Sequence, residues 1–275
     1  MKKLYCTFSV SFIALAAFLS SCSYNPGPTV VPIDTTHNSK LTFKKDFDAR
    51  YDIFLVDTAK NGNNADHINL TDSVKKNIEE KIIDTTRSLT DKNGITKNHV
   101  AVIVTYTNPP GSSQDTNYFY QDPNGDLYRY NFGFSILNQF TYLTQAIGSN
   151  VDVGWVLAAK MASAEGTTWV ARTDSVLIQS LGIWVYLSSQ GQMMADTSFL
   201  VGTETIKARH SRNTVTATAA GGASTGGESG IVMIDSYYSA AINAVVEDFF
   251  RHVTLSGSLL KQQAQGKFKI LTTHN

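Results

Sequence analysis

Cys22, near the N-terminus, is the residue whose setting points most directly to chemistry. Lys2 and Lys3 form a positively charged start, and the apolar stretch from Leu4 to Leu19 follows. This stretch is too short and too poorly flanked to be a comfortable membrane span, and two small residues separate it from the Cys22 thiol. The pattern predicts that residues 1–21 are a signal that is removed.

The sequence Leu19-Ser20-Ser21-Cys22 resembles the lipobox of bacterial lipoproteins, position by position. The resemblance implies that Cys22 is acylated, becomes the new N-terminus and anchors the chain in a lipid bilayer of the cell envelope. Ser23 in the next position agrees with sorting to the outer membrane, and the lack of an acidic cluster after it favours the periplasmic face. The alternative is an ordinary secretory signal followed by an incidental cysteine.

The segment that follows the signal, residues 22–40, is expected to be a flexible tether that carries the lipidated cysteine. It is polar, and Pro26, Pro28 and Pro32 supply three of the six prolines. Such a stretch cannot bury enough apolar surface to fold, and as a coil it spans roughly 20–25 Å. Residues 41–275 are predicted to form a β-rich domain, either undivided or split into two subdomains near residue 148.

The composition argues against several classes of function. Cys6 leaves with the signal and Cys22 is acylated, so no thiol remains for a disulfide or a cysteine enzyme. The chain has 23 basic and 23 acidic residues without a basic cluster, so nucleic acid is not an expected partner. The six histidines lack the short spacing of a zinc site. We therefore expect no metal and no cofactor.

Motifs for catalysis or for ion binding fail at their decisive positions. Asp122, Asn124 and Asp126 imitate the start of a calcium loop, but Leu127 and Gly133 stand where a glycine and a carboxylate are required. The chain contains no Gly-x-Ser-x-Gly nucleophile motif. We expect that the protein is not an enzyme, although a triad assembled from distant residues would leave no trace in sequence order.

The best candidate for a binding surface is an aromatic β-hairpin. The sequence Asp122-Pro123-Asn124-Gly125-Asp126 favours a tight reversal between two strand-like segments. Alternation then allows six rings to line one face, where they could stack on sugar rings, cradle a lipid chain or simply fill the core of a curved sheet. We expect the core use for Tyr130 and Phe132. The six candidates are Tyr118, Tyr120, Tyr128, Tyr130, Phe132 and Phe134.

The remaining pattern favours strands. Period-two alternation starts at Leu41 and is clearest from Phe43 to Leu55, and it recurs from Val100 to Tyr106. Residues 72–89 are ambiguous between a helix and a hairpin arm, and we favour strand; Ile136 to Ala146 is a candidate helix. Further strands are expected at 151–158, 167–171, 176–187, 197–209, 213–219, 231–238, 241–254 and 266–273, with a loop at 220–230.

These features predict an all-β, mainly antiparallel fold: a strongly curved sheet, half-barrel or sandwich with at most one or two short helices. In its succession of strand and turn signals, the chain is similar to β-rich envelope lipoproteins of unknown function, whose curved sheets resemble half-barrels. The resemblance implies a non-catalytic, lipid-anchored envelope protein that binds an apolar ligand or another envelope component. The alternative is a glycan-binding or adhesive module that presents the aromatic hairpin outward.

Overall fold

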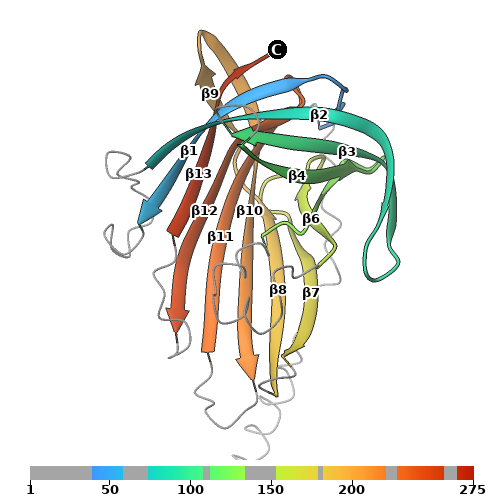
Figure 1. The fold of residues 1–275 in the computed structure, drawn as a ribbon, viewed down its shortest axis with the longest axis vertical. Coiled ribbons are helices and arrows are strands. Elements are labelled where there is room, and N and C mark those ends of the chain that lie inside the picture. Colours follow the sequence, from blue (N-terminus) through green and yellow to red (C-terminus); the bar gives the residue numbers. More distant parts are fainter. Residues whose placement is uncertain are drawn as a thin grey trace, which may run out of the picture. The chain divides into compact units, whose positions relative to one another are not determined.

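The computed structural model describes residues 39–57, 74–107, 112–133, 153–178, 182–220, 228–256 and 265–275 (Figure 1). None of these residues belongs to an α-helix, so no apolar helix of membrane-spanning length occurs among them. The signal, the lipobox with Cys22, the tether up to residue 38 and the candidate helix at 136–146 lie outside the described residues. The strands are β1 (Asp48–Asp57), β2 (Val74–Thr90), β3 (Thr96–Thr107), β4 (Ser112–Gln121), β5 (Asp126–Tyr130), β6 (Trp155–Lys160), β7 (Thr168–Ile178), β8 (Ile183–Met193), β9 (Thr197–Val201), β10 (Glu204–Ala220), β11 (Glu228–Ser239), β12 (Ala244–Ser256) and β13 (Gln265–His274).

All of these strands belong to one 13-stranded antiparallel sheet, which confirms the predicted fold class. The order is β6-β5-β4-β3-β2-β1-β13-β12-β11-β10-β8-β7, and β9 pairs with the first part of β10. Strands from both sides of residue 148 therefore share the same sheet. In Figure 1 the strands β2 to β4 run across the direction of β10 to β12, so the sheet is strongly curved.

The first strand begins later than the alternation suggested. Ala49, Tyr51 and Ile53 are buried on one face of β1, as period two requires. The chain before β1 instead makes a turn in which Asp46 takes a left-handed backbone conformation with φ of 68°. The predicted strand start at Leu41 is therefore wrong, because this turn separates Phe43 from the strand.

Of the ambiguous segment at 72–89, residues 74–89 belong to a strand, as favoured, and residues 72–73 lie outside the described part. β2 and β3 form a long hairpin, and its register shifts at three places between Ile82 and Leu89. Such bulges bend and twist a strand pair. The hairpin in Figure 1 accordingly curves away from the direction of β4.

Glycine and asparagine turns changed other predicted boundaries. The expected strand at 197–209 is divided at Gly202, whose φ of 61° suits a tight turn, into β9 and β10. The expected strand at 241–254 starts only at Ala244, because a turn with Asn243 at φ of 54° precedes it. The predicted loop at 220–230 is too long, because β10 ends at Ala220 and β11 begins at Glu228. Residues 221–227 lie outside the described part.

The two end strands of the sheet order approach each other, so the sheet is nearly closed. Trp169 on β7 donates a hydrogen bond from Nε1 to the carbonyl of Leu157 on β6, at 2.9 Å. The β5–β6 register shifts beside Ala158, and the Ala158 carbonyl accepts hydrogen bonds from Ser211 Oγ at 3.0 Å and Asn213 Nδ2 at 2.8 Å. Side chains of β7 and β10 thus donate hydrogen bonds to backbone carbonyls of an end strand.

Candidate functional site

The aromatic hairpin forms as predicted, and its turn explains the calcium-like spacing. β4 and β5 pair around a turn in which Gly125 has φ of 88°. The Oδ1 atom of Asp122 accepts hydrogen bonds from the backbone N–H groups of Asn124 and Asp126, each at 2.9 Å. Asp126 itself pairs with Lys160 at 3.1 Å. These carboxylates therefore hold the turn, which is a common use of aspartate in this position.

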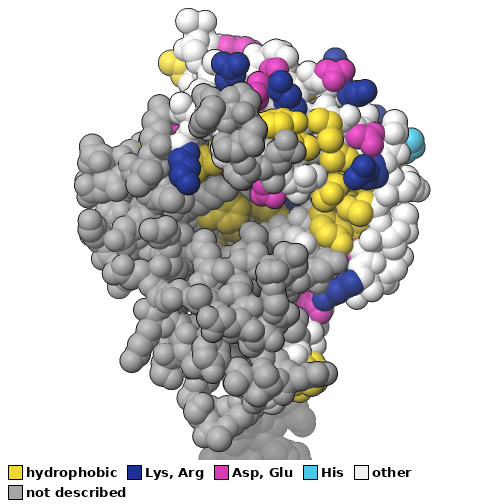
Figure 2. All heavy atoms as spheres, viewed as in Figure 1, with side chains coloured by type: hydrophobic (Ala, Val, Ile, Leu, Met, Phe, Trp, Pro, Cys, Tyr) yellow, Lys and Arg dark blue, Asp and Glu magenta, His cyan; other side chains and the backbone are white. Residues whose placement is uncertain are grey.

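Four of the six predicted rings share one face. Tyr120 lies directly opposite Tyr128, with ring centroids 6.0 Å apart, and the Tyr118 and Tyr130 rings are also 6.0 Å apart. Trp155 on the neighbouring strand β6 joins them, 5.2 Å from the Tyr130 ring. We call Tyr118, Tyr120, Tyr128, Tyr130 and Trp155 the tyrosine face. Figure 2 shows hydrophobic side chains gathered where Figure 1 draws β4 and β6, bordered by charged ones.

Phe132 lies on the opposite side, so the prediction of six rings on one face is wrong. Asn131 takes a left-handed conformation with φ of 53°, and its Oδ1 accepts hydrogen bonds from the N–H groups of Val153 and Gly154. This ends the alternation after β5. Phe132 is only 5% exposed and packs in the interior, with its ring centroid 6.3 Å from that of Phe250. Phe134 lies outside the described residues.

The end of the β2–β3 hairpin lies against the tyrosine face. Lys97 Nζ is 3.8 Å from the centre of the Tyr128 ring and 4.8 Å from that of Tyr120, within the range of a cation–π contact. Trp155 donates a hydrogen bond from Nε1 to the carbonyl of Leu89, at 3.3 Å. The four tyrosines are consequently half-buried rather than displayed as an open row.

The tip of the same hairpin reaches β7. Asp91 is 5% exposed and lies 3.6 Å from Arg172 NH1, and Lys92 Nζ lies 2.7 Å from Asp174 Oδ2. Asp91 also accepts hydrogen bonds from two backbone N–H groups of its own turn. The hairpin thus bridges from the middle of the sheet to an end strand and fixes the surroundings of the tyrosine face.

This contact shifts the titration of two side chains. Burial lowers the pKa of Lys97, against the opposing effect of Asp122, Asp126 and Asp91. Burial also raises the pKa of Tyr128, and the same carboxylates near the turn add to that shift. A lysine held over phenol rings and near carboxylates stabilises the packing of the hairpin.

The other face of β5 points into a buried charge network. Arg129 donates two hydrogen bonds to Asp248, each at 3.0 Å, and Asp248 also accepts one from Ser236 at 2.6 Å. Lys269 lies 3.8 Å from Asp248 and 3.1 Å from both carboxylate oxygens of Glu80. This chain of alternating charges joins β5, β12, β13 and β2 across the interior.

Arg129 and Asp248 favour the ionised state of each other. Burial alone would raise the pKa of the Asp248 carboxyl, but Arg129 and then Lys269 outweigh it and lower that pKa. Burial likewise opposes the charge on Arg129, yet Asp248 holds its pKa above the ordinary value. Burial raises the pKa of Tyr51 and Tyr238, whose hydroxyls therefore stay neutral. The arrangement is a satisfied structural network rather than a poised acid or base.

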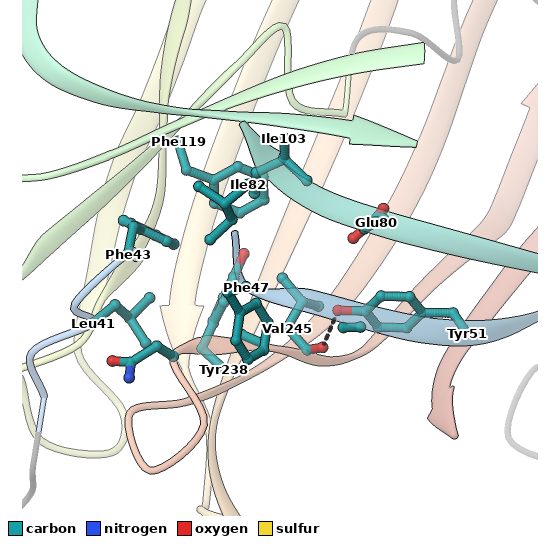
Figure 3. Close-up of a pocket in the computed structure, with 13 residues that line it drawn as sticks. Leu41, Phe43, Phe47, Tyr51, Glu80, Ile82, Ile103, Phe119, Tyr238 and Val245 are labelled. Carbon is teal, nitrogen blue, oxygen red and sulfur yellow. Dashed lines mark hydrogen bonds between the residues drawn. The ribbon is translucent and has the colours of Figure 1, made fainter. Parts of the chain in front are cut away.

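Figure 3 shows the hollow that lies beside this network. Leu41, Phe43 and Phe47 from the segment before β1 converge there on Ile82 and Phe119, and the Tyr51 hydroxyl donates to the Val245 carbonyl at 3.0 Å. The cavity volume is only about 20 Å³. That is room for about one water molecule, and an acyl chain does not fit.

The sequence predicted the hairpin but not the residues from other strands that pack on its rings. Trp155 and Lys97 join the tyrosine face from strands that are not part of the hairpin, and nothing in their local sequence marks that contact. Asp91, Lys92 and the β7 residues that they meet are likewise far apart in the chain. Within the described residues, no three histidine, cysteine, aspartate or glutamate side chains form a group that could hold a metal ion.

Comparison with known proteins adds one remote likeness. No protein-family model matches the chain, and no curated protein matches it significantly. Among solved structures the chain is similar to a "putative lipoprotein" from Parabacteroides distasonis, with a TM-score of 0.41 and 8% sequence identity over 84% of this chain and 96% of that chain. A likeness of this degree transfers neither a site nor a function to this chain.

Proposed function

We propose that the protein is a non-catalytic, lipid-anchored protein of the bacterial cell envelope whose sheet domain binds another envelope component on its surface. The anchor is Cys22, for which the support is the lipobox-like sequence Leu19-Ser20-Ser21-Cys22. The tether that follows gives the domain reach, since a coil of that length spans roughly 20–25 Å. The outer membrane, with the domain on its periplasmic side, is the proposed location.

The observation that carries the surface-binding part of the proposal is the small volume of the interior hollow lined by Leu41, Tyr51 and Phe119. An apolar ligand held inside would need a cavity of several hundred cubic ångströms. The interior hollow next to Tyr51 and Phe119 has a volume of about 20 Å³. Of the partners expected from the sequence, an envelope component bound outside therefore fits the described residues better than an apolar ligand bound inside.

The state of the buried charges supports a non-catalytic role. A catalytic acid or base needs a hydrogen-bonding atom that is free to contact a substrate. Asp248 instead accepts hydrogen bonds from Arg129 and Ser236, and Lys269 is paired with Glu80. These pairings connect strands, and they occupy the carboxylate oxygens of Asp248 and the ammonium group of Lys269.

Metabolic labelling tests the anchor. Cells that express the full chain and are fed a radiolabelled fatty acid should incorporate label into the wild type, and Cys22→Ala should abolish incorporation and leave the precursor uncleaved. Cys6→Ala is the matched control, because Cys6 lies inside the predicted signal, and it should label like the wild type. Label in Cys22→Ala, or none in the wild type, would refute the lipid anchor.

A further inference from the structure

The outer face of β7, β8 and β10 combines exposed aromatic rings with serine and threonine side chains. Along β8 the side chains of Val185, Leu187 and Ser189 are buried, whereas those of Trp184 and Tyr186 point to the opposite, exposed face. Hydroxyl-bearing residues of the neighbouring strands flank the two rings. We call this surface the hydroxyl shelf; its members are Thr173 and Ser175 on β7, Trp184, Tyr186 and Ser188 on β8, and Thr216 and Thr218 on β10.

The pairing register places hydroxyls on both sides of one ring. Tyr186 lies opposite Ser175 on β7 and opposite Thr218 on β10. Ser188 lies in the same way between Thr173 and Thr216. The Ser188 row therefore presents aliphatic hydroxyl-bearing residues on three neighbouring strands, which are about 4.8 Å apart. In the Tyr186 row, two such residues flank the ring.

The two rings form an exposed aromatic surface. Trp184 is 42% exposed and Tyr186 is 51% exposed, and their planes lie within 22° of parallel with centroids 6.4 Å apart. Of the seven large hydrophobic side chains that are exposed in the described part, four lie on this outer side of β7 and β8. They are Val170, Leu177, Trp184 and Tyr186. Apolar side chains gathered on an exposed face mark interaction sites more often than chance.

The shelf is also hollowed. A surface depression with a volume of about 470 Å³ is lined by Thr173, Ser175, Tyr186, Ser188, Thr216 and Thr218. Its one charged lining residue, Asp174, is paired with Lys92 at 2.7 Å. The depression thus offers a ring face and several hydroxyls but no cation among its lining residues.

We propose that the hydroxyl shelf binds an uncharged glycan chain, and this inference rests on the proposed role in binding an envelope component. Sugar hydroxyls both donate and accept hydrogen bonds, and serine and threonine hydroxyls do the same. The C–H face of a sugar ring packs on an aromatic ring as apolar surface does. The depression is of the size of a small-molecule site and is open, so a polymer can pass along it.

Other ligands match the shelf less well. A phosphorylated or otherwise anionic ligand would need arginine or lysine, and none of the described residues that line the depression is either. An acyl chain needs an enclosed groove that buries most of its surface, whereas this depression is shallow and open. The tyrosine face is a poorer glycan platform than the shelf, because Lys97 and Leu89 contact its rings.

The three tryptophans make a direct binding assay possible. Trp155 and Trp169 are 3% and 9% exposed, so Trp184 should account for most fluorescence that acrylamide quenches. The full acylated chain, in a polyoxyethylene detergent that carries no sugar, is titrated with maltohexaose, cellohexaose, laminarihexaose and mannohexaose. At least one of these four oligosaccharides should protect the Trp184 fluorescence from acrylamide quenching. The protection should saturate, with a Kd of about 1 mM or tighter.

Variants locate the site by calorimetry with the same oligosaccharide. Trp184→Ala and Tyr186→Ala should each weaken binding at least tenfold, and Thr218→Val several-fold. Leu200→Ala is the matched control, because Leu200 is 76% exposed on β9, away from the shelf, and binding should not change. Melting curves establish that every variant is folded.

Several results would overturn the inference: no protection by any of the four oligosaccharides, or unchanged affinity in both aromatic variants. Protection by phosphatidylcholine vesicles instead of sugars would show a lipid surface as the ligand. The assay does not depend on acylation, so Cys22→Ala should bind the oligosaccharide like the wild type. Glycan binding without fatty-acid labelling would refute only the anchor, and labelling without glycan binding would refute only the shelf.

Discussion

Arg129 and Asp248 lie 119 positions apart in the chain, and their side chains form a two-bonded ion pair in the interior, with both N–O distances at 3.0 Å. Arg129 is 8% exposed and Asp248 is 2% exposed. The guanidinium also lies 4.1 Å from the centre of the Phe132 ring, so aromatic packing covers its flat face. The pair connects β5, near one end of the sheet order, with β12 in its other half.

Removal of one partner should destabilise the fold strongly. Arg129→Met leaves Asp248 buried with only Lys269 as a nearby cation, so we expect a loss of about 3–5 kcal/mol in the free energy of unfolding, measured in urea. The double variant Arg129→Met with Asp248→Leu should recover a substantial part of that loss, because no uncompensated charge remains. A control on the exposed Arg50–Glu79 pair, Arg50→Ala, should cost about 1 kcal/mol or less. A single Arg129→Met variant as stable as this control would contradict the assigned role.

Glu247 should make stability depend on pH. Burial raises the pKa of its carboxyl to about 7 from the ordinary value of 4.5, and the carboxylates of Asp248 and Asp235 raise it further. Between these values the folded state binds more protons than the unfolded state, so stability falls as pH rises from about 4.5 to about 7 and is then constant.

The variant Glu247→Gln isolates this effect. It should match the wild type near pH 4 and be more stable at pH 8 by on the order of 1–2 kcal/mol, after allowance for partial exposure to solvent. Urea unfolding at a series of pH values provides the measurement. Parallel stability curves for the two proteins from pH 4 to pH 8 would show that the carboxyl titrates normally.

Phe132 and Tyr130 should differ in their contributions to stability. Phe132 is buried, so Phe132→Ala should cost about 3–5 kcal/mol through the cavity that it leaves. Tyr130 is half-buried against Tyr118 and Trp155, so Tyr130→Ala should cost less, roughly 1–2 kcal/mol. Thermal melting compares the two directly. Equal losses would mean that the tyrosine face is as closed as the interior.

The local sequence predicted most of the strands and several turns. It wrongly placed breaks at 172–175 and 210–212, where β7 and β10 continue, and it missed the separation of β7 from β8. Asp122-Pro123-Asn124-Gly125-Asp126 specifies a tight turn through residues that lie next to one another, and β4 and β5 follow from it. Alternation in β1 identified Ala49, Tyr51 and Ile53 as one face of a strand. The predicted all-β antiparallel class followed from such short-range signals, which need no distant partner.

Tertiary structure alone decided which side of a strand is buried and where the sheet closes. In β5 the tyrosines looked like the buried face, yet Leu127 and Arg129 point inward, because the carboxylate that pairs with Arg129 belongs to β12. The contacts of Lys97 with the tyrosine face and of Trp169 with β6 also join distant segments. A single sequence does not encode such pairings locally, since an arginine or a tryptophan suits either face of an isolated strand until a partner compensates its burial.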